Sequence, residues 1–592
     1  EGGGALAIQS SVGGNNRTVL NNKTWNFDNG GGTLTFNGGN HLFQGGGSTH
    51  NFDVTAAGSG SLIRSTNGGF MNMQGSGNIE FDVADGAEDR DLTLSATFNN
   101  GLITKDGAGT LAITGTINGS YAIDINAGTL EVGDSARLAG GTFTAAITND
   151  GVFKHSSNQT QTLSGNISGT GAIEKIGGAA LTLSGNNTYS GTTILGDGTT
   201  ANSVIVAGST TGLSSNSAFI VNSEGALKLN GNDSSIGSLA GNGIVRNENA
   251  TGATLTTGGD NSSTTFSGIL QDGAGGGTFG LTKVGTGTMT LTGANQHTGT
   301  TTLNAGTLVL GNVSAAGTGT ISQTDGTSLL RLNTTGTVTN AMSLYNVESL
   351  QDVTLSGNIT ANNTTYDIAT GTTTTLSGDI SGSGGVTKEG LGTLVLEGTN
   401  TYTGTTDINA GTLLINASNA GATSAYEINS GGTLGGTGSI GGATTLDSGG
   451  FLSPGDGGTG DTLSFLSSLD IQNASAGSLL FDLGAAGTGD TVNVTGQLSI
   501  GDGLLDLDSF AFTDLGVTSV TGTYTWNLFN VGSYDFTTLG SNTTSTPFAS
   551  IKSASLAISG NFIQLTMTVP EPSSTALLGL GGIALMLRRK RS

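Results

Sequence analysis

The chain has 592 residues, no cysteine and a net charge of −24 at pH 7, with 18 Lys and Arg against 42 Asp and Glu. Without cysteine, disulfides, cysteine-ligated metals and thiol nucleophiles are excluded. A strongly acidic chain repels nucleic acids and anionic lipid surfaces, because both bind clustered cations. We therefore expect no nucleic-acid partner. Divalent cations and neutral polymers suit this charge better, and the composition agrees with export.

The glycine and proline content separates this chain from fibrous and disordered proteins. It has 105 Gly and only 4 Pro, and the glycines do not recur at every third position as in collagen. Disordered chains are poor in β-branched residues, whereas Thr, Val and Ile alternate here over hundreds of residues. No stretch before the C-terminal tail has the 3.6-residue apolar period of a helix. We predict an all-β protein with one elongated repeat body.

The densest acidic group lies early in the chain. It consists of Asp82, Asp85, Glu88, Asp89 and Asp91. Carboxylate oxygens are hard ligands of the kind that calcium prefers. We favour a solvated acidic turn, with a calcium site as the alternative, and we expect no other metal or cofactor.

Four segments share one pattern of a Gly turn, a short alternating strand, a Gly-Asn turn and further short strands. The copies lie near residues 101–132, 171–206, 280–311 and 385–416, and their lysines are Lys105, Lys175, Lys283 and Lys388. A single coil of this kind cannot bury its own apolar row, so the pattern predicts stacked coils. We expect residues 1–450 to form about 20 coils of roughly 20–25 residues each.

The residues that define the pattern also carry a family resemblance. The first copy begins with Lys105-Asp-Gly-Ala-Gly-Thr-Leu111 and closes on Asn126-Ala-Gly-Thr-Leu130, and the third and fourth copies repeat both runs with small changes. These units resemble the autotransporter-associated β-strand repeat of secreted bacterial passenger proteins. The resemblance implies an all-β fold, a right-handed parallel β-helix or solenoid.

No catalytic constellation is visible in these repeats. His297 stands where two other copies have Tyr189 and Tyr402, which favours a structural ring, and the repeat lysines favour a turn-capping or solvated role. An asparagine suited to turns or to a ladder recurs after glycine, at Asn187, Asn295 and Asn400. Enzymes on β-helices need clustered cations with a metal, or paired carboxylates in a cleft. We predict no catalytic residues and no enzyme.

The residue composition and the repeat pattern change after residue 450. Residues 451–568 contain strand-like runs such as Ser478–Leu483 and Phe562–Met567, and much of the aromatic content. We favour a β-rich cap continuous with the solenoid, because a solenoid must protect its last edge. A small separate β domain is the alternative. Two Gly-Asp runs ending at Asp461 and Asp490 are similar to the calcium-binding nonapeptide but depart from its spacing.

Residues 569–592 form a tail of three blocks. Pro570, Glu571 and Pro572 form a turn, an uncharged apolar run extends from 573 to 587, and Arg588, Arg589, Lys590 and Arg591 form a basic tetrad. As a helix, the apolar run would span only ~22 Å, less than the ~30 Å hydrocarbon core, so we predict a short transmembrane helix with snorkelling ends. The cations would stay in the cytoplasm.

These three blocks resemble the PEP-CTERM sorting signal of Gram-negative bacteria. The resemblance implies an exosortase, a membrane cysteine protease and transpeptidase, that processes the tail near Pro570-Glu571-Pro572. It further implies an exported protein that is anchored transiently in the inner membrane and then delivered to the cell surface or its matrix. Export requires a signal peptide, so we expect that a leader preceding Glu1 was removed or that the N-terminus is truncated.

Together these features predict a non-enzymatic, secreted structural protein of the cell surface or extracellular matrix. Rows of Thr, Asn and Ser suit weak multivalent contact with exopolysaccharide or cell-surface glycans, as in a biofilm. The first alternative is an adhesin that binds glycans or other cells. The second is a β-helical enzyme that acts on polysaccharide.

Overall fold

The computed structural model describes residues 5–9, 18–20, 24–27, 32–37, 40–44, 49–54, 60–66, 69–74, 77–199, 202–500, 504–540, 548 and 551–571. These residues form a β-solenoid of about 19 turns. The only helical elements among them are four 3₁₀ turns: η1 (Ala139–Gly141), η2 (Ala485–Gly487), η3 (Leu507–Ser509) and η4 (Val517–Ser519). The predicted all-β solenoid is confirmed.

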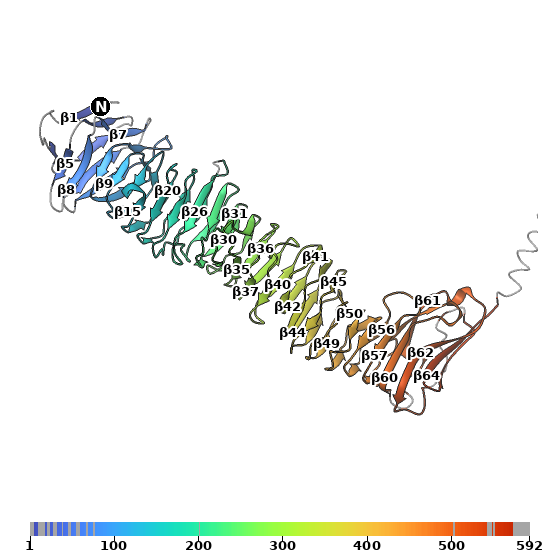
Figure 1. Ribbon diagram of the computed structural model, residues 1–592. Helices are drawn as coiled ribbons and strands as arrows, with labels where there is room; N and C mark the ends of the chain where they lie inside the picture. Colours follow the sequence, from blue (N-terminus) through green and yellow to red (C-terminus); the bar gives the residue numbers. More distant parts are fainter. Residues whose placement is uncertain are drawn as a thin grey trace, which may run out of the picture. The chain divides into compact units, whose positions relative to one another are not determined.

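The chain divides into two compact units, and the first comprises residues 1–328. One of its coils consists of β10 (Leu92–Leu94), β11 (Thr97–Asn99) and β12 (Leu102–Asp106). The next coil repeats the arrangement with β13 (Thr110–Ile113), β14 (Thr116–Asn118) and β15 (Ile123–Ile125). Each strand pairs in parallel with its counterpart in the next coil, and Figure 1 shows this stacking in blue and green.

The core of each coil is built by the alternation of the strands. Leu92 lies beside Leu111, and Ile103 lies beside Ile123, in neighbouring coils. All four are buried. Stacking therefore buries apolar side chains on their equivalents, which one coil could not do alone.

Glycine is required at corners where coils approach closely. Gly107 has a φ of +75°, and a Cβ there would lie 2.3 Å from the carbonyl oxygen of Val83 in the preceding coil. An L side chain would meet both a strained backbone and a steric clash. This corner follows directly after Lys105 and Asp106, so the repeat motif forms the turn.

The second unit comprises residues 329–592 and contains two long parallel faces. The first face includes β44 (Ile359–Ile368), β47 (Val386–Glu389), β49 (Thr406–Ile408), β52 (Tyr426–Ile428), β55 (Thr444–Leu446) and β58 (Leu469–Asp470). The second includes β45 (Thr373–Leu376), β48 (Thr393–Leu396), β50 (Gly411–Ile415), β53 (Gly432–Gly436), β56 (Phe451–Pro454), β59 (Leu479–Gly484) and β61 (Phe510–Leu515). Parallel pairing thus extends past residue 450. The predicted domain boundaries at 450 and 568 stay predictions.

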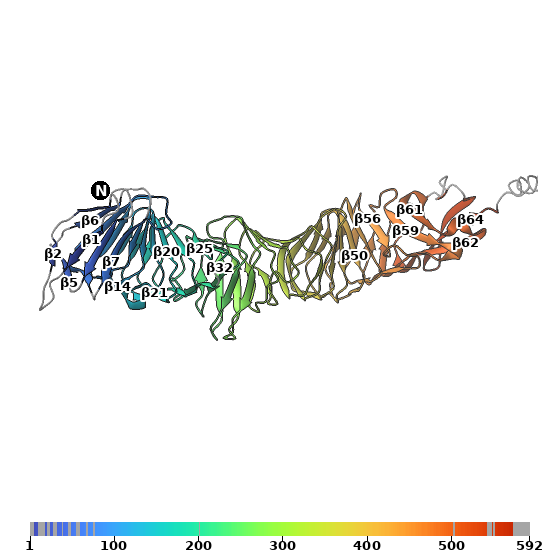
Figure 2. The ribbon, with the colours of Figure 1, turned by 90° about the horizontal axis from the view of Figure 1, so that it is seen from above.

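The pairing changes direction near the end of the second unit. β60 (Thr491–Ser499) pairs in parallel with β62 (Gly522–Tyr534), but β62 pairs antiparallel with β64 (Phe562–Val569). On its other edge, β64 pairs antiparallel with β63 (Ser553–Ser559). Both ribbon views show β62 and β64 side by side (Figures 1 and 2). These three antiparallel strands are called the terminal sheet below.

Within the described residues, no helix has the length and apolar character needed to cross a membrane. The short transmembrane helix predicted from the sequence falls at 573–587, outside the described residues. Its existence therefore stays a prediction.

Candidate functional site

The four repeat lysines point into the solenoid. All four are at most 1% exposed. The Lys105 ammonium group donates to the carbonyl oxygens of Asp106 and Gly107 at 2.7 Å each, and to that of Ala127 in the next coil at 3.1 Å. Lys283 and Lys388 make the same three bonds, with Ala305 and Ala410 as the third acceptors. Lys175 donates to Ile176 and Gly177.

This geometry decides between the two roles predicted for the lysines. Each one caps a turn, and the solvated role is wrong, because the amine is buried among carbonyl oxygens. Burial lowers the pKa of Lys105, Lys175 and Lys388 to about 8. Three of the four also join two coils through the Asn-Ala-Gly run that closes each copy. We call this arrangement the lysine staple, and it leaves the amine inaccessible to a substrate.

The recurring asparagines join coils in a similar way. The side-chain oxygens of Asn187, Asn295 and Asn400 each accept from a backbone N–H at 2.8 Å, of Ile167, Leu270 and Ile380 respectively. All three side chains are buried. The predicted turn or ladder role is thereby confirmed as a side-chain-to-backbone bond between coils.

His297 occupies the slot of a buried tyrosine, as the sequence predicts. It is fully buried, its Nδ1 lies 3.2 Å from the carbonyl oxygen of Gly299, and burial lowers its pKa. In the equivalent slots, the hydroxyl of Tyr189 lies 2.8 Å from that of Thr193, and the hydroxyl of Tyr402 lies 2.7 Å from that of Thr406. The ring is therefore part of the core.

The early acidic group is partly built into the turn that follows β9 (Asn78–Val83). Asp91 is buried, and its two carboxylate oxygens accept from the backbone N–H groups of Gly86 and Thr110 at 2.8 Å each. Asp82 is on β9, in register with Asp53 and Asp106 of neighbouring coils. In the described part of the chain, no group of three or more His, Asp or Glu could hold a metal ion. A calcium site at Asp82, Asp85, Glu88, Asp89 and Asp91 stays a prediction.

The two Gly-Asp runs of the second unit come together. Asp490 is 1% exposed, and its carboxylate accepts from the backbone N–H groups of Asp461 and Asp482 at 3.2 Å each. Burial, together with the neighbouring carboxylates of Asp482 and Asp461, raises the pKa of Asp490 to about 6. Asp490 therefore joins the segments around Asp461 and Asp482 as a buried hydrogen-bond acceptor.

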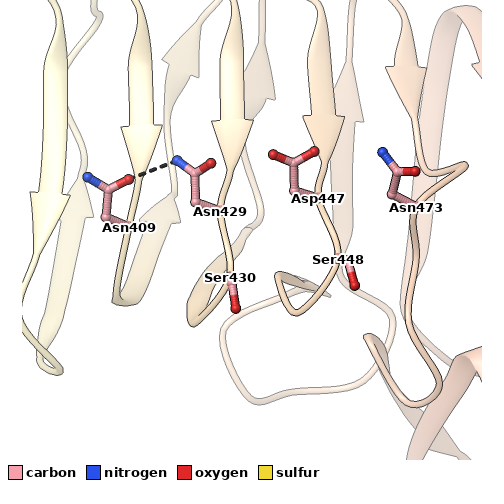
Figure 3. Close-up of a pocket in the computed structure, with 6 residues that line it drawn as sticks. All are labelled: Asn409, Asn429, Ser430, Asp447, Ser448 and Asn473. Atoms are coloured by element: carbon pink, nitrogen blue, oxygen red, sulfur yellow. Dashed lines mark hydrogen bonds between the residues drawn. The ribbon is translucent and has the colours of Figure 1, made fainter.

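An open pocket of about 640 Å³ lies along one edge of the second unit. The six residues that line it are all polar: Asn409, Asn429, Ser430, Asp447, Ser448 and Asn473. Figure 3 shows four of these side chains in a row at the ends of neighbouring strands. We call Asn409, Asn429, Asp447 and Asn473 the polar row.

The row follows from the sequence of each coil. Asn409, Asn429 and Asp447 directly follow β49, β52 and β55, whose last residues Ile408, Ile428 and Leu446 are in register and buried. Because parallel strands in register end at one edge, the next residue of each coil lies beside its neighbours, with the coil spacing of about 4.8 Å.

Hydrogen bonds align part of the row and leave the rest open. The Asn409 amide donates to the carboxylate of Glu389 at 2.6 Å, and the Asn429 amide donates to the side-chain oxygen of Asn409 at 2.8 Å. Among the described residues, the side chains of Asp447 and Asn473 form no hydrogen bond with the protein. These two groups, and the Asn429 oxygen, are therefore available to a ligand.

A second line of side chains follows the row on the same sheet. Asp407, Glu427, Thr445 and Asp470 are in register on successive strands. Among the described residues, none of these carboxylates forms a salt bridge. The face beside the pocket is therefore acidic and uncompensated.

Sequence reasoning missed the polar row. Its signal is a polar residue directly after each short strand, in Ile408-Asn409, Ile428-Asn429 and Leu446-Asp447. That signal becomes visible only when the coils are aligned, and coils of unequal length hide it.

Residues 103–132, 173–201, 281–310 and 386–415 match the model of the passenger-associated-transport-repeat. Residues 568–591 match the PEP-CTERM protein-sorting motif. The chain carries passenger-type repeats and a PEP-CTERM sorting motif. Both resemblances predicted from the sequence are confirmed. Three of these four repeats contain a lysine staple, and the second contains Lys175, which makes the two turn bonds.

The chain is similar to a curated protein, the adhesin BmaC autotransporter of Brucella suis biovar 1 (strain 1330), with 30% identity over 329 residues. The aligned region is 52% of this chain but only 9% of the length of that adhesin. The sorting motif, the repeats and this relative together indicate an exported cell-surface protein. The motif also implies processing by an exosortase.

Proposed function

We propose that this protein is a non-enzymatic structural component of the extracellular matrix, and that its polar row binds exopolysaccharide chains. The polar row in its open pocket is the observation that supports this function. A side-chain amide both donates and accepts hydrogen bonds, as a sugar hydroxyl does. The row presents one amide or, at Asp447, one carboxylate per coil, and the apolar residues are held inside.

The repetition of the row suits a polymer better than a small ligand. Equivalent groups recur at about 4.8 Å along the edge, so neighbouring sugars of one chain can contact neighbouring coils. Each exposed contact is weak, but contacts on one tethered polymer add as avidity. The acidic line beside the row favours a neutral or amine-bearing polysaccharide over an acidic one, because like charges repel.

The sorting motif supplies the location that this function requires. Deletion of residues 570–592 is expected to abolish delivery to the cell surface, while the body still folds because the terminal sheet ends at Val569. Fractionation of cells expressing the full chain and the deletion variant checks this. Unchanged surface localisation of the variant contradicts the proposal.

An adhesin is the second candidate, and the similarity to the BmaC adhesin favours it. An adhesin binds a receptor on other cells saturably, whereas a matrix protein co-purifies with its own polysaccharide. Enzymatic action on polysaccharide is a third candidate function. The buried repeat lysines do not support it, because a substrate cannot reach their amines. Release of reducing ends or unsaturated sugars from a glycan panel would show that the protein is an enzyme and would contradict our proposal.

A further inference from the structure

The sorting motif begins directly where the terminal sheet ends. Val569, the last residue of β64, is buried and paired with Gly522 of β62, and Thr568 is paired with Ser553 of β63. The next two residues, Pro570 and Glu571, are exposed. No linker therefore separates a fully paired strand from the motif.

A central strand is a poor substrate for a protease. Proteins that bind an extended peptide commonly add it to a sheet edge through main-chain hydrogen bonds. Both edges of β64 are already occupied, by β62 and β63. In the folded protein, residues on the N-terminal side of the motif therefore offer an enzyme no free backbone edge.

The C-terminal side of β64 leaves little room for an enzyme. Residues 570–572 are all that lies between β64 and the predicted apolar run that starts at 573. Three extended residues reach at most about 10 Å. An enzyme working at the membrane would therefore meet the folded terminal sheet beside the bond that it must reach.

Spontaneous opening of β64 is strongly disfavoured. Its side chains Ile563, Leu565, Met567 and Val569 are all at most 5% exposed. The strand FIQLTMTV contains no charged residue whose hydration would favour opening of the strand. Release of β64 would break two ladders and expose four apolar side chains, so it amounts to unfolding of the whole terminal sheet.

We propose that the exosortase-type enzyme processes the tail before β64 closes between β62 and β63. Closure of this strand then ends the period in which the tail is a substrate. Processing breaks one peptide bond: the acyl carbon of the body passes to water or an acceptor amine, and the released tail amine takes a proton. This inference rests on the processing that the motif implies, and it is independent of glycan binding.

A spacer variant tests the proposal. The purified, folded full chain is presented to membranes that contain the exosortase, and loss of the tail is followed by intact mass. Insertion of a Gly-Ser spacer of about ten residues between Val569 and Pro570 reaches roughly 30 Å. We expect the spacer variant to lose its tail at least about tenfold faster than the wild-type chain, because cleavage of the latter depends on rare opening. Equal rates would overturn the proposal.

The matched control carries the same spacer at Gly560, in the turn between β63 and β64. Gly560 has a φ of +60° and no heavy atom within 4 Å of its would-be Cβ, so the insertion is tolerated there. We expect this control to be processed as slowly as the wild-type chain. If this control is processed as fast as the variant with the spacer after Val569, the spacer acts without exposing the motif, and the proposal is overturned.

A reversible lock on β64 provides a second measurement. Leu565→Ala loosens the strand, and we expect it to accelerate processing of the folded chain. Thr525 and Thr566 face each other across β62 and β64 with their hydroxyls 3.0 Å apart. Because the chain has no other cysteine, Thr525→Cys with Thr566→Cys gives one disulfide. In the Leu565→Ala background, formation of this disulfide should slow processing to the wild-type rate, and its reduction should make processing fast again. A processing rate that is the same in the oxidised and reduced forms would contradict the proposal.

Discussion

At the scale of single residues, buried charge joins neighbouring coils. A lysine staple places an ammonium group among carbonyl oxygens that turns would otherwise leave unpaired, and it supplies one donor to each. The third acceptor lies 22 residues later in the chain. The staple therefore stabilises the stacking of two coils and not only one turn.

Replacement of Lys388 tests the staple. Lys388→Met keeps most of the volume but leaves the carbonyl oxygens of Glu389, Gly390 and Ala410 without their donor. We expect a loss of about 1–3 kcal/mol in the free energy of unfolding, measured by urea denaturation. Hydrogen exchange should place the weakened region in the two coils around residue 388. The exposed Lys552 is the control, since Lys552→Met should change stability by less than about 0.5 kcal/mol. Equal effects of the two substitutions contradict the staple.

Asp490 gives the stability of the second unit a defined pH dependence. Burial raises the pKa of Asp490 to about 6, whereas an unfolded aspartate has a pKa of about 3.9. Between about pH 4 and pH 6 the folded state keeps a proton that the unfolded state has lost, so stability falls as the pH rises. The shift corresponds to roughly 2–3 kcal/mol.

Unfolding monitored by tryptophan fluorescence in a Trp25→Phe background, which leaves only Trp526, measures this effect. Trp526 is buried, and its indole N–H donates to the carbonyl oxygens of Gly484 and Thr488 near Asp490. Asp490→Asn should remove the difference in stability between pH 4 and pH 6 that this carboxyl contributes. A variant with the same pH profile as the wild-type chain would show that Asp490 titrates normally.

At the scale of the repeat, one slot accepts two kinds of ring. Tyr189 and Tyr402 each hydrogen-bond to a threonine four residues later. His297 fills the slot in the third copy, where Thr301 instead donates to the carbonyl oxygen of Ala316. The interior of that coil therefore lacks one side-chain bond that its equivalents have.

Restoration of the tyrosine should stabilise the third copy. His297→Tyr is expected to add about 0.5–1.5 kcal/mol to the free energy of unfolding through a bond to Thr301. The reverse substitution, Tyr402→His, should lose a similar amount. Urea denaturation of both variants checks the pair. A destabilised His297→Tyr variant would show that the third copy has repacked around its histidine.

The repeats explain how far the sequence could predict these elements. Period-2 alternation and the recurring Lys, Gly and Asn predicted the stacked coils, because those features repeat within single short segments. The burial of Lys105 and the partners of Asn400 could not be predicted, since each depends on carbonyl or amide groups of a neighbouring coil. The polar row was not predicted for the same reason, because Asn429 and Asp447 become neighbours only when coils of unequal length are aligned.

At the scale of the molecule, the chain combines an apolar, hydrogen-bonded interior with a polar exterior. Each unit keeps its apolar side chains, lysine staples and asparagine bonds inside. The outside is polar, acidic and free of cysteine. Such a surface suits many weak contacts with a neutral polymer, as the proposed function requires.

Co-sedimentation with exopolysaccharide from the bacterium that produces the protein is the most direct test of binding by the polar row. Purified protein is co-sedimented with the polysaccharide, using the wild-type chain and the triple variant Asn429→Ala, Asp447→Ala, Asn473→Ala, which removes the side-chain groups of the polar row that are available to a ligand. Three lost hydrogen-bonding groups at about 0.5–1.5 kcal/mol each predict at least about a tenfold loss of affinity. The control is Thr337→Ala, Thr360→Ala, Thr401→Ala, which removes three exposed hydroxyls of the same unit outside the polar row, and it should bind like the wild-type chain. Unchanged binding of the first variant, or no binding by the wild-type chain, would show that the polar row does not bind exopolysaccharide.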